Sequence, residues 1–298
     1  MPILPCELLD HIVDHLHDSK ISLMNCCLVS KSWIPRARRQ LFADVNFLDM
    51  DSIQSWKRTF PDHSASPAHY AKTLLVGCPQ VVQIVGAEAG SWIASFSSVE
   101  RLRLGGWGLY AHGWEMSFVL FRGLSPVIKS LRVEFSTLPL PHIFDFALSF
   151  PLLEDLGVTS HYPSVFIGNG GNVDGLSAVV QPSNLPKLTG SLELLLKGGM
   201  EPIARQLLSL PSGIHFRKLV LGWYCERDIS LTMVLMERCS RTIESLDIRY
   251  DLGGTSNGHP GPLGWLTSIP RQVNIGFARP LESDGAQRCG FSARFAES

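Results

Sequence analysis

The chain has little of what marks membrane, secreted or nucleic-acid-binding proteins. No apolar run reaches the roughly 18 residues of a membrane-spanning helix. The N-terminus carries Glu7 and Asp10 instead of the basic segment of a signal peptide. The 26 basic and 27 acidic residues give a net charge of −1, which indicates neither nucleic acid nor an anionic membrane as a partner. We therefore expect a soluble intracellular protein, cytoplasmic or nuclear.

The cysteines do not form a recognisable framework. There are seven, which is an odd number, and no pair has the C-x-x-C spacing of many metal and redox sites. Cys26 and Cys27 are adjacent, and the others are scattered along the chain. This distribution is typical of free or buried thiols in a reducing compartment.

Catalytic and cofactor motifs are also scarce. His11 and His15 have the spacing of a helical zinc pair, but Ile12 stands where a metalloprotease has glutamate. The glycine-rich run 168–173 ends in Val173, where a dinucleotide-binding loop has its third glycine. The sequence therefore predicts a protein that is not an enzyme and needs no cofactor or metal. A site assembled in the fold from distant residues stays open as an alternative.

Residues 4–42 have the pattern of three short helices. In the first, the apolar residues recur at helical spacing and form one wide stripe: Leu8, Leu9, Ile12, Val13 and Leu16. Pro5 and Glu7 suit the first turn of this helix.

A second helix follows residues 18–19, with Ser22 as the predicted N-cap. Its apolar residues are Leu23, Cys26, Cys27 and Val29. A third helix is expected to start within residues 32–35, because proline is tolerated near a helix start. It would carry Arg36, Arg38 and Arg39 outward, as a solvated face, and Leu41 and Phe42 inward. Three helices of this size make a weak core, and the apolar stripe is wider than such a bundle covers, which indicates a partner surface.

These residues resemble the F-box family, and most closely the F-box-like proteins abundant in mushroom-forming fungi. The matching elements are Leu4-Pro5-x-Glu7-Leu8-Leu9, Ile12, Leu16 and Cys26-x-Leu28-Val29-Ser30-Lys31-x-Trp33. Cys6 stands where many members have a second proline. The resemblance implies docking onto a Skp-family adaptor and, through it, onto a cullin-RING ubiquitin ligase. The residues it assigns to the docking surface or its support are Pro5, Leu8, Leu9, Ile12, Leu16, Leu28, Val29 and Trp33.

A second pattern, apolar-x-x-apolar-x-apolar, returns along the rest of the chain. Its middle and last positions are apolar in all eight instances, and the first position fails only at Thr189. The instances are Phe42/Val45/Phe47, Ala71/Leu74/Val76, Val99/Leu102/Leu104, Ile128/Leu131/Val133, Leu153/Leu156/Val158, Thr189/Leu192/Leu194, Phe216/Leu219/Leu221 and Ile243/Leu246/Ile248. A ninth pair, Val273 and Ile275, would close the array.

The spacing of these instances is typical of repeats. Successive middle residues are 25–29 residues apart, except for one interval of 36 that contains the glycine-rich run. Segments of helical length lie between them, at 113–124, 141–150, 201–210 and 229–239. Parallel strands alternating with outer helices would stack into a solenoid, and the chain here resembles the degenerate leucine-rich repeats found behind many F-boxes. The asparagine ladder of the regular repeat is missing, which leaves the curvature open.

The predicted organisation is therefore α/β, with an F-box at 1–42, a leucine-rich-repeat-like domain at 43–278 and a disordered tail at 279–298. An ordinary parallel α/β domain is the alternative for the central region. The N-terminal helices could instead cap that domain, in which case the protein would be a non-catalytic binding scaffold unconnected with ubiquitin ligase.

Four aromatic residues lie at or just past the predicted strand ends, where a solenoid has its rim: Trp107, Trp223, Tyr224 and Tyr250. Aromatic side chains are favoured anchors at protein interfaces, so these are candidates for contact with a target protein. Plugging the ends of an irregular core is the alternative role. The leading hypothesis is a substrate receptor of a cullin-RING ligase, which holds an unknown target protein near the ligase.

Overall fold

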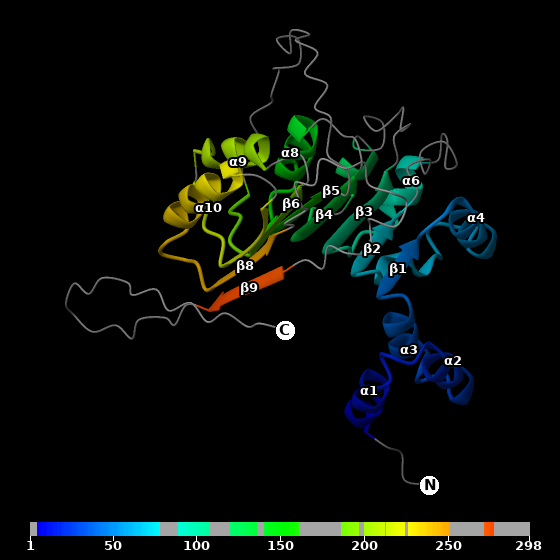
Figure 1. Ribbon diagram of the computed structural model, residues 1–298. Coiled ribbons are helices and arrows are strands. Elements are labelled where there is room, and N and C mark those ends of the chain that lie inside the picture. Colours follow the sequence, from blue (N-terminus) through cyan, green and yellow to red (C-terminus); the bar gives the residue numbers. More distant parts are fainter. Residues whose placement is uncertain are drawn as a thin grey trace, which may run out of the picture. The chain divides into compact units, whose positions relative to one another are not determined.

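The computed structural model describes residues 5–77, 89–107, 118, 120–124, 126–135, 140–160, 186–196, 200–211, 213–223, 226–250 and 271–276. For some of these residues, including Leu9 and all of 271–276, it describes the backbone only. The chain divides into two compact units, Met1–Ser130 and Leu131–Ser298. Helices and strands alternate in both units after the first three helices, so the fold class is α/β as predicted (Figure 1).

The first unit begins with three helices and continues with strands and helices in alternation. Its elements are α1 (Cys6–His15), α2 (Lys20–Val29), α3 (Ile34–Leu41), β1 (Asp44–Phe47), α4 (Met50–Thr59), the 3-10 helix η1 (Pro67–Tyr70), β2 (Thr73–Val76), α6 (Ala89–Ala94) and β3 (Arg101–Trp107). In Figure 1, α1 and α2 stand apart from the strands of this unit, and α3 leads into β1.

The second unit repeats the alternation of strand and helix. Its elements are β4 (Ser130–Phe135), α8 (Leu140–Leu148), β5 (Asp155–Ser160), β6 (Ser191–Leu196), α9 (Glu201–Leu208), β7 (Lys218–Trp223), α10 (Glu226–Arg238), β8 (Ser245–Tyr250) and β9 (Arg271–Gly276). The helices expected at 141–150, 201–210 and 229–239 are therefore confirmed as α8, α9 and α10.

The strand register confirms the repeat read from the sequence. In the first unit β1, β2 and β3 are parallel neighbours in chain order, and Val45 pairs with Leu74, which pairs with Leu102. In the second unit Leu156, Leu192, Leu219 and Leu246 pair in succession across β5 to β8, also in parallel. The middle apolar position of one repeat therefore lies beside the middle position of the next.

The last strand corrects one expectation. Val273 and Ile275 do pair with the repeat positions of β8, Val273 with Ile248 and Ile275 with Leu246. The strand β9 runs antiparallel to β8, however, whereas the array was predicted to be parallel throughout. A period of two is the same in both directions, so the sequence pattern does not specify the direction of a strand.

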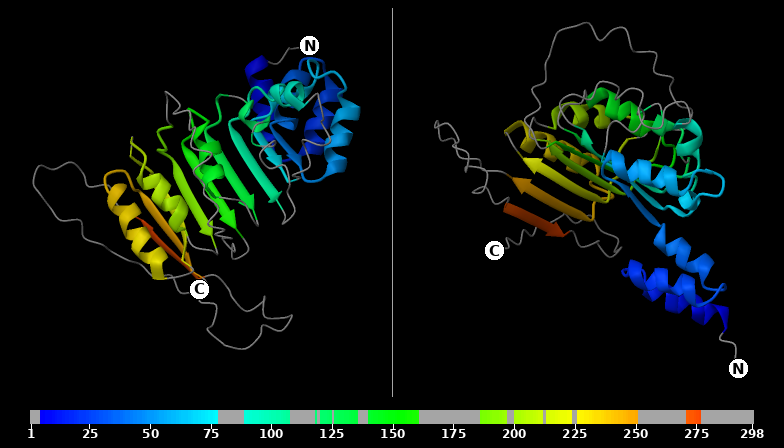
Figure 2. Two further views of the ribbon diagram at one scale, coloured as in Figure 1. Left: turned by 90° about the horizontal axis from the view of Figure 1, so that it is seen from above. Right: turned by 90° about the vertical axis from the view of Figure 1, so that its right-hand side faces the viewer.

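One face of the strands carries the core, and the reason is the alternation of side chains along each strand. The repeat leucines and valines are fully buried, as Leu192 and Leu194 illustrate, whereas Glu193 between them points to the other face. In the second unit α8, α9 and α10 lie over one face of the strands, and no described helix of this unit lies over the opposite face (Figure 2). We call this opposite face the open face.

The starts of the strands share one hydrogen-bond pattern. The backbone N–H groups of Lys72 and Thr73 both donate to the carbonyl of Ala43, at 2.8 and 2.9 Å. In the second unit those of Glu244 and Ser245 both donate to the carbonyl of Arg217, at 2.7 and 3.1 Å. Each of these two repeats therefore begins with hydrogen bonds to a carbonyl of the repeat before it, and these bonds agree with the register of the strands that follow.

The core of the first unit is an aromatic cluster around Phe47. The ring of Phe47 lies 5.6 Å from Trp56, 5.4 Å from Trp92 and 6.0 Å from Phe96, measured between ring centroids. Edge-to-face and tilted arrangements at this separation are favourable for aromatic pairs. The cluster joins β1 to α4 and α6, so it fixes the first strand against its helices.

Two helix starts differ from the sequence-based expectation. The N-cap of α2 is Ser19, whose hydroxyl accepts from the N–H of Ser22, so the prediction that Ser22 is the cap was wrong. Helix α4 was not predicted, although Asp49 and Ser52 form a reciprocal capping box at its start. Its sequence has one buried apolar residue, Ile53, and this explains the weak periodicity.

Gly190 leaves the space in which Asp155 anchors the start of β6. The carboxylate of Asp155 accepts from the N–H and the hydroxyl of Ser191, at 2.5 and 2.8 Å. A Cβ at position 190 would overlap this carboxylate. We expect Gly190→Ala to lower the free energy of unfolding by about 1–3 kcal/mol through overpacking. Urea unfolding checks this, with Gly90→Ala as the control, because a Cβ at Gly90 meets nothing within 4 Å.

Within the described residues, no helix combines the length and the apolar character that a membrane crossing requires.

Candidate functional site

Helices α1 to α3 have a small core of their own. Val13 from α1, Leu23 and Cys26 from α2 and Ala37 from α3 are buried together. Four partly buried side chains pack around them: Leu16, Cys27, Trp33 and Leu41. A core of four buried residues stabilises three helices only weakly. The apolar side chains that these helices leave outside the core are therefore described next.

Much apolar surface on α1 and α2 is left in contact with solvent. Six of the eleven large apolar side chains that are exposed among the described residues belong to these two helices, and their exposure is between 41 % and 85 %. They are Leu8, Ile12, Ile21, Met24, Leu28 and Val29. We call these six residues the helical apolar surface. Exposed apolar side chains concentrated in this way are typical of surfaces that bind a protein, a membrane or a ligand.

Helix α2 is apolar on two opposite sides. Leu23 and Cys26 point into the helical core, while Ile21, Met24 and Leu28 recur at spacings of three and four residues on the other side. One apolar stripe is enough for a helix to pack against the core of a small bundle, and its opposite side is then usually polar. The second stripe has no counterpart in the described part of the chain, and Leu28 is 85 % exposed.

The structure places the residues assigned from the resemblance in two groups. Pro5, Leu8, Ile12, Leu28 and Val29 are exposed.

The other group supports the surface from inside, because Leu16 and Trp33 are packed against the helical core. The side chain of Leu9 lies outside the described residues. Sequence reasoning missed Ile21 and Met24, although their helical spacing to Leu28 is a signal that was available.

A polar clamp holds α1 against α3. The carboxylate of Asp14 accepts from Nε of Arg36 at 2.7 Å and also pairs with Nη2 of that guanidinium. Nε2 of Gln40 donates to the same carboxylate at 2.7 Å. The prediction that Arg36 points outward into solvent was therefore wrong. Its guanidinium crosses to α1, because a bidentate arginine–carboxylate pair is stronger than a solvated charge.

The clamp makes the stability of the contact between α1 and α3 dependent on pH. The hydrogen bonds from Arg36 keep the pKa of the Asp14 carboxyl below its usual range, and the interaction raises the pKa of Arg36. A carboxyl whose pKa is lowered in the folded state contributes stability above its unfolded pKa of about 4, and that stability is lost as the pH falls through the folded pKa.

We expect Asp14→Asn to lower the free energy of unfolding of the helical segment by about 1 kcal/mol at neutral pH. The difference from the wild type should shrink as the pH falls below about 4, the unfolded pKa, and should vanish only once the pH has passed below the lowered pKa of Asp14. Urea unfolding followed by helical circular dichroism at neutral and at acidic pH measures it. Asp18→Asn is the control, since Asp18 pairs only with the exposed His17 among the contacts described. An equal effect of the two variants would contradict the clamp.

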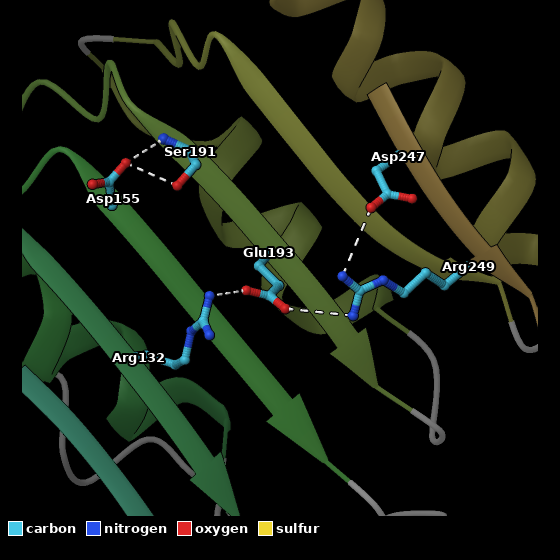
Figure 3. Close-up of polar contacts among 6 residues, drawn as sticks. All are labelled: Arg132, Asp155, Ser191, Glu193, Asp247 and Arg249. Atoms are coloured by element: carbon cyan, nitrogen blue, oxygen red, sulfur yellow. Dashed lines mark hydrogen bonds and ion pairs between the residues drawn. The ribbon is translucent and has the colours of Figure 1, made fainter. Parts of the chain in front are cut away.

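A second candidate site lies on the open face of the second unit (Figure 3). Glu193 on β6 accepts from Nη2 of Arg132 on β4, and its other oxygen lies 3.9 Å from Nη1 of Arg249 on β8. Nη2 of Arg249 lies 3.7 Å from the carboxylate of Asp247 on the same strand. We call these four residues the open-face charge network.

Gly157 on β5 leaves room for the side chain of Arg132 on β4 to reach Glu193 on β6, across the strand that lies between them. Glu193 pairs with Gly157 in the register, so the side chain of Arg132 passes over Gly157 to reach it. A Cβ at position 157 would lie 3.2 Å from Cγ and 3.3 Å from Nε of Arg132. That is tighter than ordinary contact, so a larger side chain there would push Arg132 away from Glu193.

The predicted aromatic rim falls largely outside the described side chains. Trp107, Trp223 and Tyr250 are the last residues of β3, β7 and β8, and Trp223 pairs with Tyr250 in the register. Their side chains and the whole of Tyr224 are outside the described part of the chain. The rim role therefore stays a prediction.

Sites for chemistry are sparse among the described residues. No group of three His, Cys, Asp or Glu side chains is arranged there to hold a metal ion. His11 and His15 lie on the exposed side of α1 with ring centroids 4.4 Å apart. A shallow hollow of about 490 Å³ lies beside the C-terminal end of α10, between His215, Arg238 and Arg241. Burial raises the pKa of the Cys26 and Cys239 thiols, which makes them poor nucleophiles.

The sequence also contains one run, Gly254 to Gly258, that has the G-x-S-x-G spelling of a nucleophile elbow, with Ser256 at its centre. An elbow of this kind joins a strand to a helix and exposes its serine at the turn. The run follows β8 but lies outside the described residues, as do the glycine-rich run 168–173 and the predicted tail 279–298.

Comparison with protein-family models and with curated proteins found no match to this chain. The function proposed below therefore rests on the residues themselves and on the resemblance in residues 1–42.

Proposed function

We propose that this protein is a non-catalytic substrate-receptor subunit of a cullin-RING ubiquitin ligase. Helices α1 to α3 act as an F-box and bind a Skp-family adaptor through the helical apolar surface. The strands and helices that follow act as an irregular leucine-rich-repeat-like solenoid, which binds a target protein.

The observation that carries the proposal is the second apolar stripe of α2, together with Leu8 and Ile12 of α1. Burying apolar area from water yields about 25 cal/mol per Å², and solvent exposure of Ile21, Met24 and Leu28 forgoes that gain. A monomeric protein gains nothing from such a surface, whereas an adaptor that covers it supplies the missing burial. Four of its six residues are among those for which the F-box resemblance implies docking: Leu8, Ile12, Leu28 and Val29.

Two features support the solenoid part of the proposal. The repeat positions pair with one another strand after strand within each unit. The first N–H groups of a repeat also donate to a carbonyl of the repeat before it, in both units. Repeats that contact mainly their neighbours and leave one strand face uncovered by helices are typical of solenoid binding proteins.

The mechanism of such a subunit is proximity. It forms and breaks no covalent bond, and it raises the effective concentration of a target lysine near the transfer machinery. Tethering of this kind commonly supplies millimolar effective concentrations, and it replaces a bimolecular encounter by an intramolecular one.

Reconstitution with a purified Skp-family adaptor tests the proposal. The full chain and the adaptor are mixed and separated by size exclusion with light-scattering detection. We expect one complex that contains one copy of each, with a Kd in the range of about 10⁻⁸–10⁻⁶ M. Two peaks at the masses of the separate proteins would contradict it. A dimer of the chain alone that excludes the adaptor would show that a second copy covers the helical apolar surface.

A further inference from the structure

The open-face charge network is layered, and its two signs lie at different depths. The side chains of Glu193 and Asp247 are 13 % and 8 % exposed, whereas those of Arg132 and Arg249 are 41 % and 40 % exposed. The four charges sum to zero, but the carboxylates lie underneath and the guanidinium groups face solvent. Among these four side chains, a partner therefore meets the guanidinium groups before the carboxylates.

The two arginines are held to different degrees. Arg132 donates a hydrogen bond to Glu193 and is fixed by it. Arg249 lies 3.9 Å from Glu193 and 3.7 Å from Asp247, which are ion-pair distances beyond hydrogen-bonding range. The N–H groups of Arg249 are thus oriented by these two acids without donating to them. A guanidinium in this state can form a bidentate pair with a further carboxylate at little cost of reorganisation.

The strands beside the network leave room for an approaching chain. Arg249 pairs in the register with Gly222 of β7, which has no side chain that could stand between this guanidinium group and a partner. The space over Gly157 of β5 is filled by Arg132 itself. Helices α8 to α10 lie on the other side of these strands (Figure 2).

We propose that the open face of the second unit binds an acidic, Asp- or Glu-rich segment of the target protein through Arg249 and Arg132. This deepens the proposed function by naming the class of target, and its biological meaning rests on that function. Charge complementarity selects this occupant. Nucleic acid is disfavoured, because phosphate backbones are bound by many cations in a row and here two arginines alternate with two acids.

Binding of a fluorescein-labelled peptide of alternating glutamate and glycine tests the proposal, with fluorescence anisotropy as the readout. We expect Arg249→Gln to raise the Kd of this peptide about tenfold, the usual worth of one charge-assisted pair. We expect Glu193→Gln to lower the Kd about threefold, because it removes the buried negative charge and keeps both arginines. A network that only stabilises the sheet would produce no tighter binding.

Matched controls make the result decisive. Arg205→Gln removes an exposed arginine of α9 that pairs with Glu201 on the same helix, and it should leave the Kd unchanged. The counterpart peptide with glutamine should bind at least about tenfold more weakly. Melting temperatures show that each variant is folded.

Several results would overturn the proposal. They are no binding of the glutamate peptide to the wild type, equal effects of Arg249→Gln and Arg205→Gln, equal binding of the glutamine peptide, or tighter binding of a single-stranded oligonucleotide. Adaptor binding is measured on the same proteins and should not change in Arg249→Gln. If the adaptor fails to bind the wild type, the proposed function fails while the peptide result still decides this inference.

Discussion

Replacing Leu8 and Leu28 by aspartate should weaken adaptor binding at least about 100-fold, while the melting temperature stays within about 2 °C of the wild type. Each buried interface leucine contributes on the order of 1–2 kcal/mol, and an unpaired carboxylate in an apolar interface adds a desolvation penalty. Both side chains are exposed in the free chain, Leu8 at 52 % and Leu28 at 85 %, so the fold loses little. Titration calorimetry with the purified adaptor measures the change.

The control for this double variant is Leu152→Asp combined with Ile229→Asp. These two residues are exposed apolar side chains of the second unit, away from α1 and α2 in the sequence. We expect their replacement to leave the affinity for the adaptor unchanged. If the two double variants weaken binding equally, or if the Leu8/Leu28 variant binds like the wild type, the assignment of the docking surface is wrong.

The second large effect is expected at Phe47, which is 2 % exposed at the centre of the aromatic cluster. Phe47→Ala should lower the free energy of unfolding of the first unit by about 3–5 kcal/mol, because it removes a ring that contacts Trp56, Trp92 and Phe96 and leaves a cavity. Urea unfolding followed by tryptophan fluorescence reports on this cluster directly.

The neighbouring residue provides a matched control for Phe47. Leu48 is 67 % exposed and lies next to Phe47 in the chain, so Leu48→Ala should change the free energy of unfolding by less than about 0.5 kcal/mol. A similar loss in both variants would mean that the cluster is not the core of the first unit.

The strands could be predicted from the sequence because their alternation is strong. The repeat predicts that middle positions such as Leu192 and Leu219 lie beside one another, and the strand register confirms this. The direction of β9 could not be predicted, since an alternating pattern is symmetric under reversal. Helix α4 was missed because its capping box at Asp49 precedes a segment with a single buried apolar residue, Ile53.

The candidate sites were predictable to different degrees. Local spacing predicted Leu8 and Ile12 of α1, because residues three and four apart share a helix face. Leu28 of α2 was assigned from the F-box resemblance and not from spacing. The open-face charge network was not predictable, because Arg132 and Glu193 are 61 residues apart and meet only once β4 to β6 are aligned. The clamp on Asp14 was missed for the same reason, since Arg36 lies 22 residues further along the chain.

Hydrogen–deuterium exchange of the full chain, with and without the purified Skp-family adaptor, is the sharpest test of the docking proposal. We expect the adaptor to slow amide exchange in residues 6–29 and to leave residues 191–196 and 218–223 unchanged, because it covers the helical apolar surface and not the strands. Binding that protects the strands and leaves residues 6–29 exchanging as in the free chain would contradict the proposal. No binding at all would contradict it equally.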